Sequence, residues 1–177
     1  MKSARSVFLV GMMGSGKTTV GRLLARRLKR SFLDSDHEVE TRCGVSISVI
    51  FDIEGEAGFR ARESQAIDEL SLTPGVVLAT GGGAVLDPQN RRRLAERGTV
   101  VYLHASPEDL FLRIGHDRNR PLLATPEPGL KLAQLYAQRD PLYREIADCI
   151  VETGRQSVNL MVRQLAASLE TAWKQSA

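Results

Sequence analysis

A chain of 177 residues with 42% hydrophobic side chains is long enough to bury one core, so we expect a single domain over residues 1–177. Its formal net charge of +3 is too small to indicate nucleic-acid binding, and its apolar stretches are shorter than the roughly 20 residues that span a bilayer. Cys43 and Cys149 match no metal-binding spacing and indicate reduced thiols. We therefore expect a cytoplasmic protein without a membrane or nucleic-acid partner.

Short apolar runs alternate with helical patterns along the chain. Strands are predicted, in chain order, over residues 6–10, 31–36, 75–80, 99–105 and 147–153. Helices are predicted after the glycine-rich residues 11–16, over about 37–70 with breaks near Gly44, Gly55 and Gly58, over 88–97, from Ser106 onward and over about 156–174. This alternation predicts an α/β fold with three layers, in which helices flank a five-stranded parallel sheet.

Residues 115–129, GHDRNRPLLATPEPG, fit neither pattern. They contain three prolines, two glycines and two arginines, and they show little helical periodicity. A loop of this length inside a compact domain is uncommon and is often a lid over a binding site. We therefore predict a mobile lid here.

The sequence GMMGSGKT, residues 11–18, forms a complete P-loop between the first predicted strand and the first predicted helix. The glycines allow backbone N–H groups to surround phosphate oxygens at the positive end of a helix dipole. Lys17 is expected to reach the β- and γ-phosphates from a solvated loop, and the Thr18 hydroxyl is placed to ligate Mg²⁺. The motif predicts a nucleoside triphosphate and Mg²⁺, and it leaves the phosphate acceptor open.

Charged residues and glycines follow the second and third predicted strands. Asp34 and Asp36 end the second strand, Arg60 and Glu63 lie on the helical segment after it, and Gly81–Gly83 end the third. Ligands of open α/β sheets bind at the carboxyl ends of strands, so these residues are candidates for the acceptor site. Of two acids two residues apart, one can bind a metal ion while the other binds a substrate hydroxyl. An arginine can bind an anionic substrate. A DxD pair alone is more often a helix cap, so the prediction depends on the combination.

Six segments occur in the order and spacing of the shikimate kinase family: GMMGSGKT, LDSD, FRARE, TGGGAV, RNRPLL and RDPLYREIAD. The chain resembles this family from Val7 to about Val162. The resemblance implies a P-loop kinase of the nucleoside monophosphate kinase-like type, with a substrate-binding helical segment at about 35–70. It also implies the activity, which is ATP-dependent phosphorylation of the 3-hydroxyl of shikimate, giving shikimate 3-phosphate and ADP on the pathway to the aromatic amino acids.

The resemblance also implies the roles of individual residues. Shikimate would be held by Asp36, Arg60, Gly82 and Arg139, with both arginines on its carboxylate and Asp36 on its hydroxyls. ATP would be bound by Gly14, Ser15, Gly16, Lys17, Thr18, Thr19, Arg120 and Gln156. Lys17, Asp36 and Arg120 would be catalytic, with Arg120 moving in with the lid to contact phosphates. Thr18 and Asp34 would hold Mg²⁺, and the protein would act as a monomer.

Two alternatives remain at this stage. A P-loop kinase acting on gluconate or a nucleoside monophosphate would share residues 11–18, but it would not need Asp36, Arg60 and Arg139 around a carboxylated ring. A non-catalytic nucleotide-binding module would signal through a partner, although the intact Lys17, Thr18 and Asp34 argue against it. ADP release measured with shikimate, gluconate and AMP distinguishes these possibilities.

Overall fold

The structure, a computed structural model, describes residues 6–117, 119–154 and 156–176. All five strands pair in parallel, in the spatial order β2-β3-β1-β4-β5. The strands are β1 (Val7–Val10), β2 (Phe32–Asp34), β3 (Val77–Ala79), β4 (Thr99–His104) and β5 (Cys149–Glu152). The predicted α/β fold with a five-stranded parallel sheet is confirmed.

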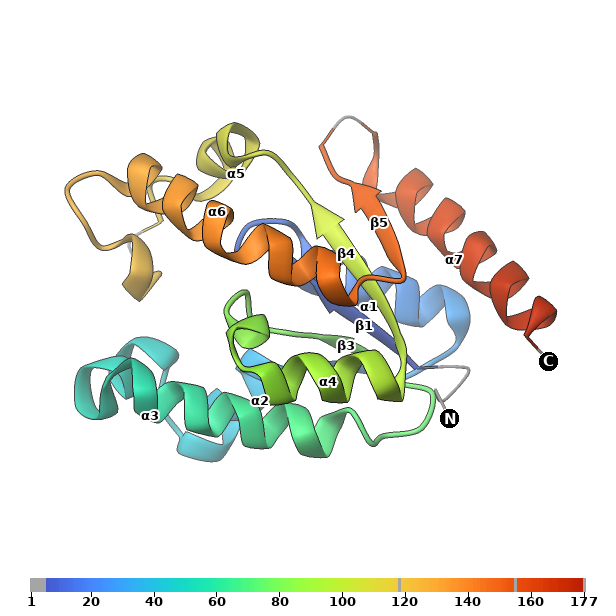
Figure 1. Ribbon diagram of the computed structural model, residues 1–177, viewed down its shortest axis with the longest axis horizontal. Helices are drawn as coiled ribbons and strands as arrows, with labels where there is room; N and C mark the ends of the chain where they lie inside the picture. The colour runs from blue at the N-terminus through green and yellow to red at the C-terminus, as the bar shows by residue number, and fades with distance from the viewer. Residues whose placement is uncertain (1–5, 118, 155, 177) are drawn as a thin grey trace.

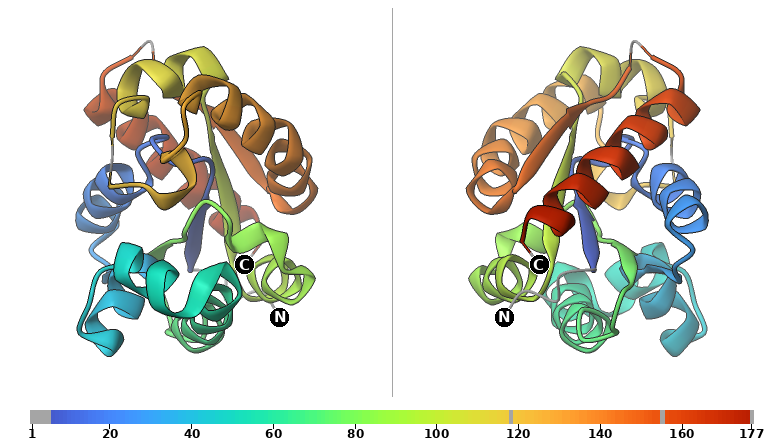
Figure 2. Two further views of the ribbon diagram at one scale, coloured as in Figure 1. Left: turned by 90° about the vertical axis from the view of Figure 1, so that its left-hand side faces the viewer. Right: turned by 90° about the vertical axis from the view of Figure 1, so that its right-hand side faces the viewer.

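Helices cover both faces of this sheet (Figure 1, Figure 2). Successive residues of a strand point to opposite faces, and in β1 both sets are buried, so the strand reads as one continuous apolar run. On one face, α1 (Lys17–Leu28) and α7 (Val158–Gln175) pack over Val7 and Leu9. On the other face, Phe8 and Val10 lie in a second core cluster. Residues of five helices join that cluster: α2 (Ser35–Cys43), α3 (Ile47–Leu70), α4 (Pro88–Arg97), α5 (Pro107–Ile114) and α6 (Pro128–Ile146).

Side-chain caps set the starts of several helices where the sequence indicated. The Asp87 side chain accepts from Gln89 N at 2.8 Å, and Pro88 occupies the first position of α4. Ser106 caps α5 in the same way. The second strand is shorter than predicted, because the Asp34 side chain caps α2 (Ser35–Cys43) and ends β2 at that residue. Asp36 therefore lies in the first turn of a helix rather than at the end of a strand.

Glycines interrupt the helical segment that follows. Gly44 ends α2 with φ of 70°, and Gly55 kinks α3 with φ of 72°, a backbone conformation that side chains disfavour. Both breaks were predicted. The break expected near Gly58 is wrong, since helical backbone continues through this residue and Gly55 alone departs from it.

Helix α6 was not predicted from the sequence; it begins at Pro128, within the predicted lid, and ends shortly before β5. A proline, Pro141, lies inside this helix and obscures its pattern. The segment between α5 and α6 contains a short 3₁₀ turn, η2 (Pro121–Leu123), and Leu123 is buried in the core. Residue 118 of the predicted lid lies outside the described residues. No helix in the described part of the chain has the length and apolar character to cross a membrane.

Candidate active site

A cavity of about 720 Å³ opens where the P-loop, α2, α3, the turn after β3 and the segment before α6 meet. Its walls include seven residues that the sequence analysis selected: Thr18, Asp34, Asp36, Arg60, Gly82, Arg120 and Arg139. Phe51 and Phe59 also line it, with ring centroids 5.1 Å apart, and provide an apolar side. Residues from five segments of the chain thus converge on one space beside the P-loop.

The P-loop connects β1 to α1. Gly14 and Gly16 have φ of 80° and 94°, so both positions need glycine. The side chain of Lys17 folds back over the loop, where Nζ donates to Gly11 O at 2.7 Å and to Met12 O at 2.8 Å. The expectation that Lys17 is solvated is wrong, because its side chain is buried, and burial lowers its pKa to about 8. Lys17 is therefore held in place before any phosphate arrives.

Thr18 and Asp34 meet at the edge of the cavity. The Thr18 hydroxyl donates to Asp34 Oδ2 at 2.8 Å, while Asp34 Oδ1 accepts from the N–H of Asp36 at 3.0 Å. One carboxylate oxygen therefore caps α2, and the other faces the predicted magnesium ligand. Among the described residues, no group of three or more His, Cys, Asp or Glu could hold a metal. A hydroxyl and one carboxylate fit Mg²⁺, which usually takes its remaining ligands from substrate phosphates and water.

Two carboxylates approach each other behind the glycine turn. Asp36 Oδ1 and Glu63 Oε2 are both shielded from solvent and lack hydrogen-bond partners in the described part of the chain. A Cβ on Gly81 would lie 2.7 Å from Asp36 Oδ1 and 2.5 Å from Glu63 Oε2, so only glycine leaves room for both. Burial raises the pKa of Asp36 to about 7, and the negative charge of Glu63 adds to this shift.

Two arginines face these carboxylates. Arg60 donates through Nη1 to Glu63 Oε1 at 2.8 Å, and its guanidinium occupies the space that a side chain at Gly83 would need. Arg139 is 1% exposed, yet its Nε and Nη1 have no partner among the described residues. Burial lowers the pKa of Arg139. A buried cation with unpaired donors is costly unless an anion completes it.

The remaining predicted residues lie at different places around the site. Arg120 donates through Nε to Asp117 Oδ2 at 3.1 Å and lines the cavity. Thr19 is exposed on the first turn of α1. Gln156 is exposed in the turn before α7 and is not part of the cavity wall, so its contact with the nucleotide stays a prediction.

One residue of the site was assigned no role from the sequence, and another was not indicated by it. Glu63 was a candidate for the acceptor site without an assigned role; it is 1% exposed and anchors Arg60. Arg113 donates through Nη1 to Gly14 O at 3.1 Å and to Thr153 Oγ1 at 3.3 Å, and so joins α5 to the P-loop and to the loop after β5. Its position at the end of a helix with no nearby motif gave no signal in the sequence.

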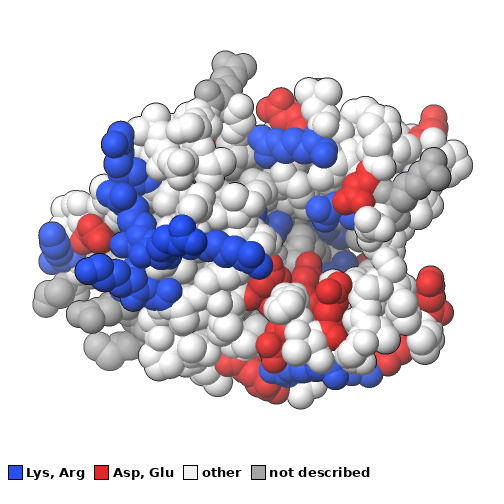
Figure 3. All heavy atoms as spheres, turned by 180° about the vertical axis from the view of Figure 1, so that it is seen from behind, with Lys and Arg blue, Asp and Glu red and all other residues white. Residues whose placement is uncertain are grey.

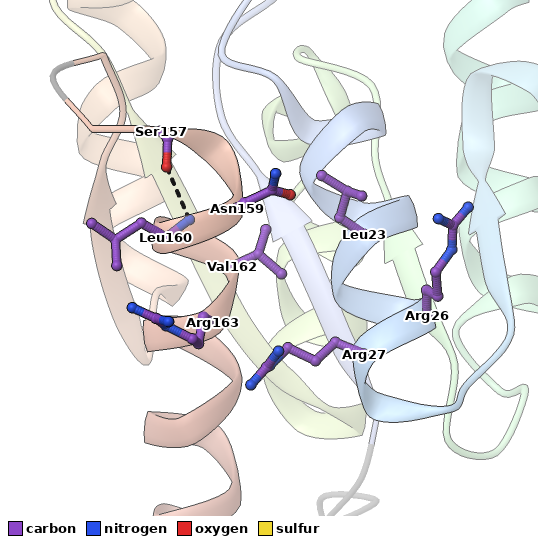
Figure 4. A pocket seen from close by; sticks show the side chains of 8 residues that line it. All are labelled: Leu23, Arg26, Arg27, Ser157, Asn159, Leu160, Val162 and Arg163. Carbon is purple, nitrogen blue, oxygen red and sulfur yellow. Dashed lines mark hydrogen bonds between the residues drawn. The ribbon is translucent and has the colours of Figure 1, made fainter.

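A second cavity, of about 580 Å³, lies between α1 and α7 (Figure 4). Arg26, Arg27 and Arg163 line it, and Figure 3 shows a band of basic side chains on the side of the molecule opposite to that in Figure 1. No P-loop residue from 11 to 18 and no acidic residue belongs to its wall. The first cavity is therefore the candidate site for the reaction.

A P-loop beside a separate polar pocket, on a parallel sheet of this order, defines a kinase of the P-loop class. A family model described as shikimate kinase matches residues 13–170. The chain is 59% identical over 170 residues to the shikimate kinase of Ralstonia nicotianae, covering 96% of this chain and 90% of the relative. It is 61% identical over 167 residues to that of Cupriavidus pinatubonensis, covering 94% and 87%. The chain belongs to the shikimate kinase family.

Comparison with solved structures supports the same family. The structure of shikimate kinase from Acinetobacter baumannii in complex with shikimate matches with a TM-score of 0.92 at 46% identity, covering 95% of this chain and 94% of that one. A gluconokinase from Sinorhizobium meliloti matches with a TM-score of 0.60 at 19% identity, which shows the fold alone. The chain is therefore an enzyme, a kinase that takes its phosphate from ATP and phosphorylates shikimate.

Proposed function

We propose that this cavity transfers the γ-phosphate of ATP to the 3-hydroxyl of shikimate, with the residues named below in distinct roles. One observation supports the acceptor assignment above the others: buried, unpaired donors of Arg139 lie in the same pocket as the unpaired Oδ1 of Asp36. A ligand with both a carboxylate and hydroxyl groups would satisfy both sides, because the carboxylate accepts from the guanidinium while a hydroxyl donates to the aspartate.

The P-loop would bind the phosphates of ATP. The backbone N–H groups around Gly14, Ser15, Gly16, Thr18 and Thr19 would surround the phosphate oxygens, and Lys17 would stabilise the charge that develops on the transferred group. Phosphate binding would also offset the cost of burying Lys17, because an anion favours its charged form. Thr18 and Asp34 would hold Mg²⁺, which supplies charge neutralisation for the phosphates when bound.

The acceptor would lie between α3 and α6. Arg60 and Arg139 would bind its carboxylate through charge-assisted hydrogen bonds, and the backbone at Gly82 would contact the ring substituents. Asp36 would accept or orient the proton of the reacting hydroxyl, and its raised pKa makes it a better base than an exposed aspartate. Phosphoryl transfer needs positioning and charge stabilisation more than covalent chemistry, so these groups suffice.

The segment around Arg120 would close over the reactants. Its guanidinium is paired to Asp117, three residues away, an exchangeable contact at the surface. Ser48 Oγ donates to Asn119 O at 3.3 Å, which already joins this segment to α3. Closure would bring Arg120 to the phosphates only when the acceptor is present and would exclude water from the transfer. The contact of Gln156 with the adenine belongs to the same proposal.

A single cytoplasmic domain acting as a monomer completes the proposal. All the residues assigned to the reaction come from one chain, so no second copy is needed to build the site. Cys43 and Cys149 form no disulfide, which is consistent with a reducing compartment. Light scattering on the purified protein tests the monomer.

ADP release coupled to NADH oxidation, with Mg²⁺ and ATP and with shikimate, gluconate or AMP as acceptor, tests the proposed function. We expect turnover with shikimate and no increase above the ATP-only rate with gluconate or AMP. Turnover with gluconate or AMP instead would assign the pocket to another acceptor. ATP binding without turnover on any of the three would favour the non-catalytic module.

A further inference from the structure

Tyr143 is a buried tyrosine of α6 that connects two parts of the acceptor pocket. It lies four residues after Arg139, so both side chains project from the same face of the helix. Its side chain is 0% exposed. The Tyr143 hydroxyl donates to the backbone carbonyl of Gly82, and the charged Arg139 guanidinium lies beside the Tyr143 side chain. The Tyr143 side chain therefore lies against both Gly82 and Arg139, two of the residues that we propose bind the acceptor.

The direction of the hydrogen bond to Gly82 is fixed by chemistry. A phenol has one proton, and the Gly82 carbonyl can only accept it, so toward a neighbouring guanidinium the hydroxyl oxygen can act only as an acceptor. Burial raises the pKa of Tyr143, although the charge of Arg139 opposes the shift, so the hydroxyl keeps its proton at neutral pH. Tyr143 is thus a fixed donor to Gly82, with the charge of Arg139 beside it.

The hydrogen bond from Tyr143 to the Gly82 carbonyl also orients the N–H group of Gly83. In a trans peptide the carbonyl of one residue and the N–H of the following residue point in opposite directions in one plane. The peptide between Gly82 and Gly83 is therefore aligned by Tyr143, and both residues line the cavity. In the described part of the chain the Gly83 N–H has no hydrogen-bond partner. It remains available as a donor to a ligand.

Glycine at 82 makes this support necessary. A Cβ there would lie 3.2 Å from Met13 N of the P-loop and 3.4 Å from Arg139 Nη1, so a side chain would crowd both. The turn therefore has no side chain of its own with which to anchor its conformation, and glycine is the most flexible residue type. Tyr143 adds from α6 a hydrogen bond to Gly82, beside those that Gly81 forms with Ser35 and Ala84.

We propose that Tyr143 is a positioning residue for the acceptor, which sets the Gly82–Gly83 peptide and the Arg139 guanidinium in the geometry that binds the carboxylated substrate. This inference rests on the proposed function of the pocket. Tyr143 does not touch the reacting atoms, and it acts on acceptor binding rather than on the nucleotide.

The structure offers a matched control in Tyr102. Its ring packs on Tyr143 with centroids 4.9 Å apart, it is 1% exposed, and its hydroxyl donates to Asp140 Oδ1 at 2.8 Å. Neither tyrosine belongs to the cavity wall itself, but Tyr143 donates to Gly82, which does, whereas Asp140, the partner of Tyr102, does not. Tyr143→Phe and Tyr102→Phe each remove one buried hydroxyl from the same stack, but only the first removes a contact with the acceptor pocket.

Steady-state kinetics of both variants test the proposal, after wild-type turnover with shikimate has confirmed the pocket's function. We expect Tyr143→Phe to raise the KM for shikimate about tenfold, the effect of leaving one buried acceptor unpaired, with the KM for ATP and kcat within about twofold of wild type. Tyr102→Phe should lower the melting temperature to a similar extent and leave all three constants within about twofold. Absence of wild-type turnover on shikimate would contradict the proposed function itself. An unchanged KM in Tyr143→Phe, or an equal rise in Tyr102→Phe, would overturn this inference alone.

A measurement on the wild type covers the case in which Tyr143→Phe does not fold. Hydrogen exchange of the Gly83 amide, followed by NMR on glycine-labelled protein with ADP bound, should slow when shikimate is added, because its N–H then donates to the ligand. The Gly75 amide, in the turn before β3, should exchange at the same rate with and without shikimate. Equal exchange at Gly83 in both conditions would contradict the alignment that we assign to Tyr143.

Discussion

The phosphate site and the acceptor pocket are adjacent, but they satisfy their polar groups in opposite ways. The P-loop comes from one stretch of eight residues, and its Lys17 already donates to two carbonyls of the same loop. The acceptor pocket is assembled from α2, α3, the turn after β3 and α6. It contains buried polar atoms that have no partner in the described part of the chain, on Asp36, Glu63 and Arg139.

The two regions therefore contribute differently to the stability of the free protein, although both serve the reaction. Buried polar groups are almost always paired, and unpaired ones destabilise the fold unless a ligand completes them. The P-loop therefore satisfies its buried lysine without a ligand, whereas the unpaired polar groups of the acceptor pocket lower the stability of the free protein until a ligand binds them. Substitution of Lys17 in the P-loop should therefore lower the melting temperature, whereas substitution of Asp36 or Arg139 in the acceptor pocket should not. Substitutions in both regions should lower activity.

The largest effect is expected for Lys17→Ala. Loss of one preorganised charge at the transferred phosphate should lower kcat on the order of 10²–10³-fold. Because Lys17 is buried and holds Gly11 and Met12, this variant should also lose thermal stability, unlike the variants of the acceptor pocket. The coupled ADP-release assay and a melting curve measure both effects. Turnover above about a third of wild type would contradict the electrostatic role.

Asp36→Asn should lower kcat by about 10²-fold, because the amide cannot accept the hydroxyl proton. ATP affinity, measured with a fluorescent nucleotide, should stay within the error of the wild type. A large loss of ATP binding would reverse the roles that we assign to Asp34 and Asp36.

The same variant should gain stability, and the size of the gain depends on pH. The pKa of Asp36 is raised from 3.8 to about 7, so its ionisation destabilises the folded state increasingly as the pH rises from about 4 toward 7. Asp36→Asn should therefore melt above the wild type at pH 7.5 and close to it at pH 4. A lower melting temperature at pH 7.5 would show that the Asp36 carboxylate is satisfied in the free protein.

Arg139→Met should raise the KM for shikimate roughly 10–100-fold, the loss of charge-assisted hydrogen bonds to a carboxylate. Its melting temperature should equal or exceed that of the wild type, because the buried guanidinium has unpaired donors in the described structure. Arg144→Met is the control on the same helix, since Arg144 is exposed and pairs with Asp140. A marked loss of stability in Arg139→Met alone would mean that Arg139 supports the fold.

Arg60→Lys should have the smallest effect, with the KM for shikimate rising about tenfold because lysine keeps the charge and loses the two-pronged geometry. The KM for ATP should change little. An increase in the KM for ATP of the same size would place Arg60 at the phosphates instead.

The sequence predicted the local features well because their signals are local. The P-loop is a contiguous motif between a strand and a helix, and Asp87 and Ser106 cap helices directly after them. The strands β1, β3 and β4 were found because buried parallel strands read as short apolar runs, whereas β2 and β5, at the edges of the sheet, are less buried. Asp34 was correctly assigned to the strand end, and its side chain also caps α2 and accepts from Thr18, whereas Asp36 lies in the helix and not in the strand.

The acceptor pocket was harder to predict because its parts are distant in the sequence. Arg139 and Tyr143 lie on α6, which was missed because Pro141 interrupts its pattern. Only the resemblance to a family indicated Arg139. Nothing local distinguishes a buried Glu63 from an exposed glutamate, or the hydroxyl of Tyr143 from an ordinary core tyrosine. Their roles appear only when α3, α6 and the turn after β3 pack together.

The central claim is that Arg60 and Arg139 of the acceptor pocket bind the carboxylate of the substrate, and an analogue of shikimate without its carboxylate tests it most directly. The KM values of shikimate and the analogue are measured for the wild type and for Arg60→Lys. We expect the analogue to be a poor substrate of the wild type, and the substitution to raise the KM for shikimate about tenfold while it changes that for the analogue by less than about twofold. An equal rise for both substrates would contradict the claim, because Arg60 would then act on the fold or the phosphates.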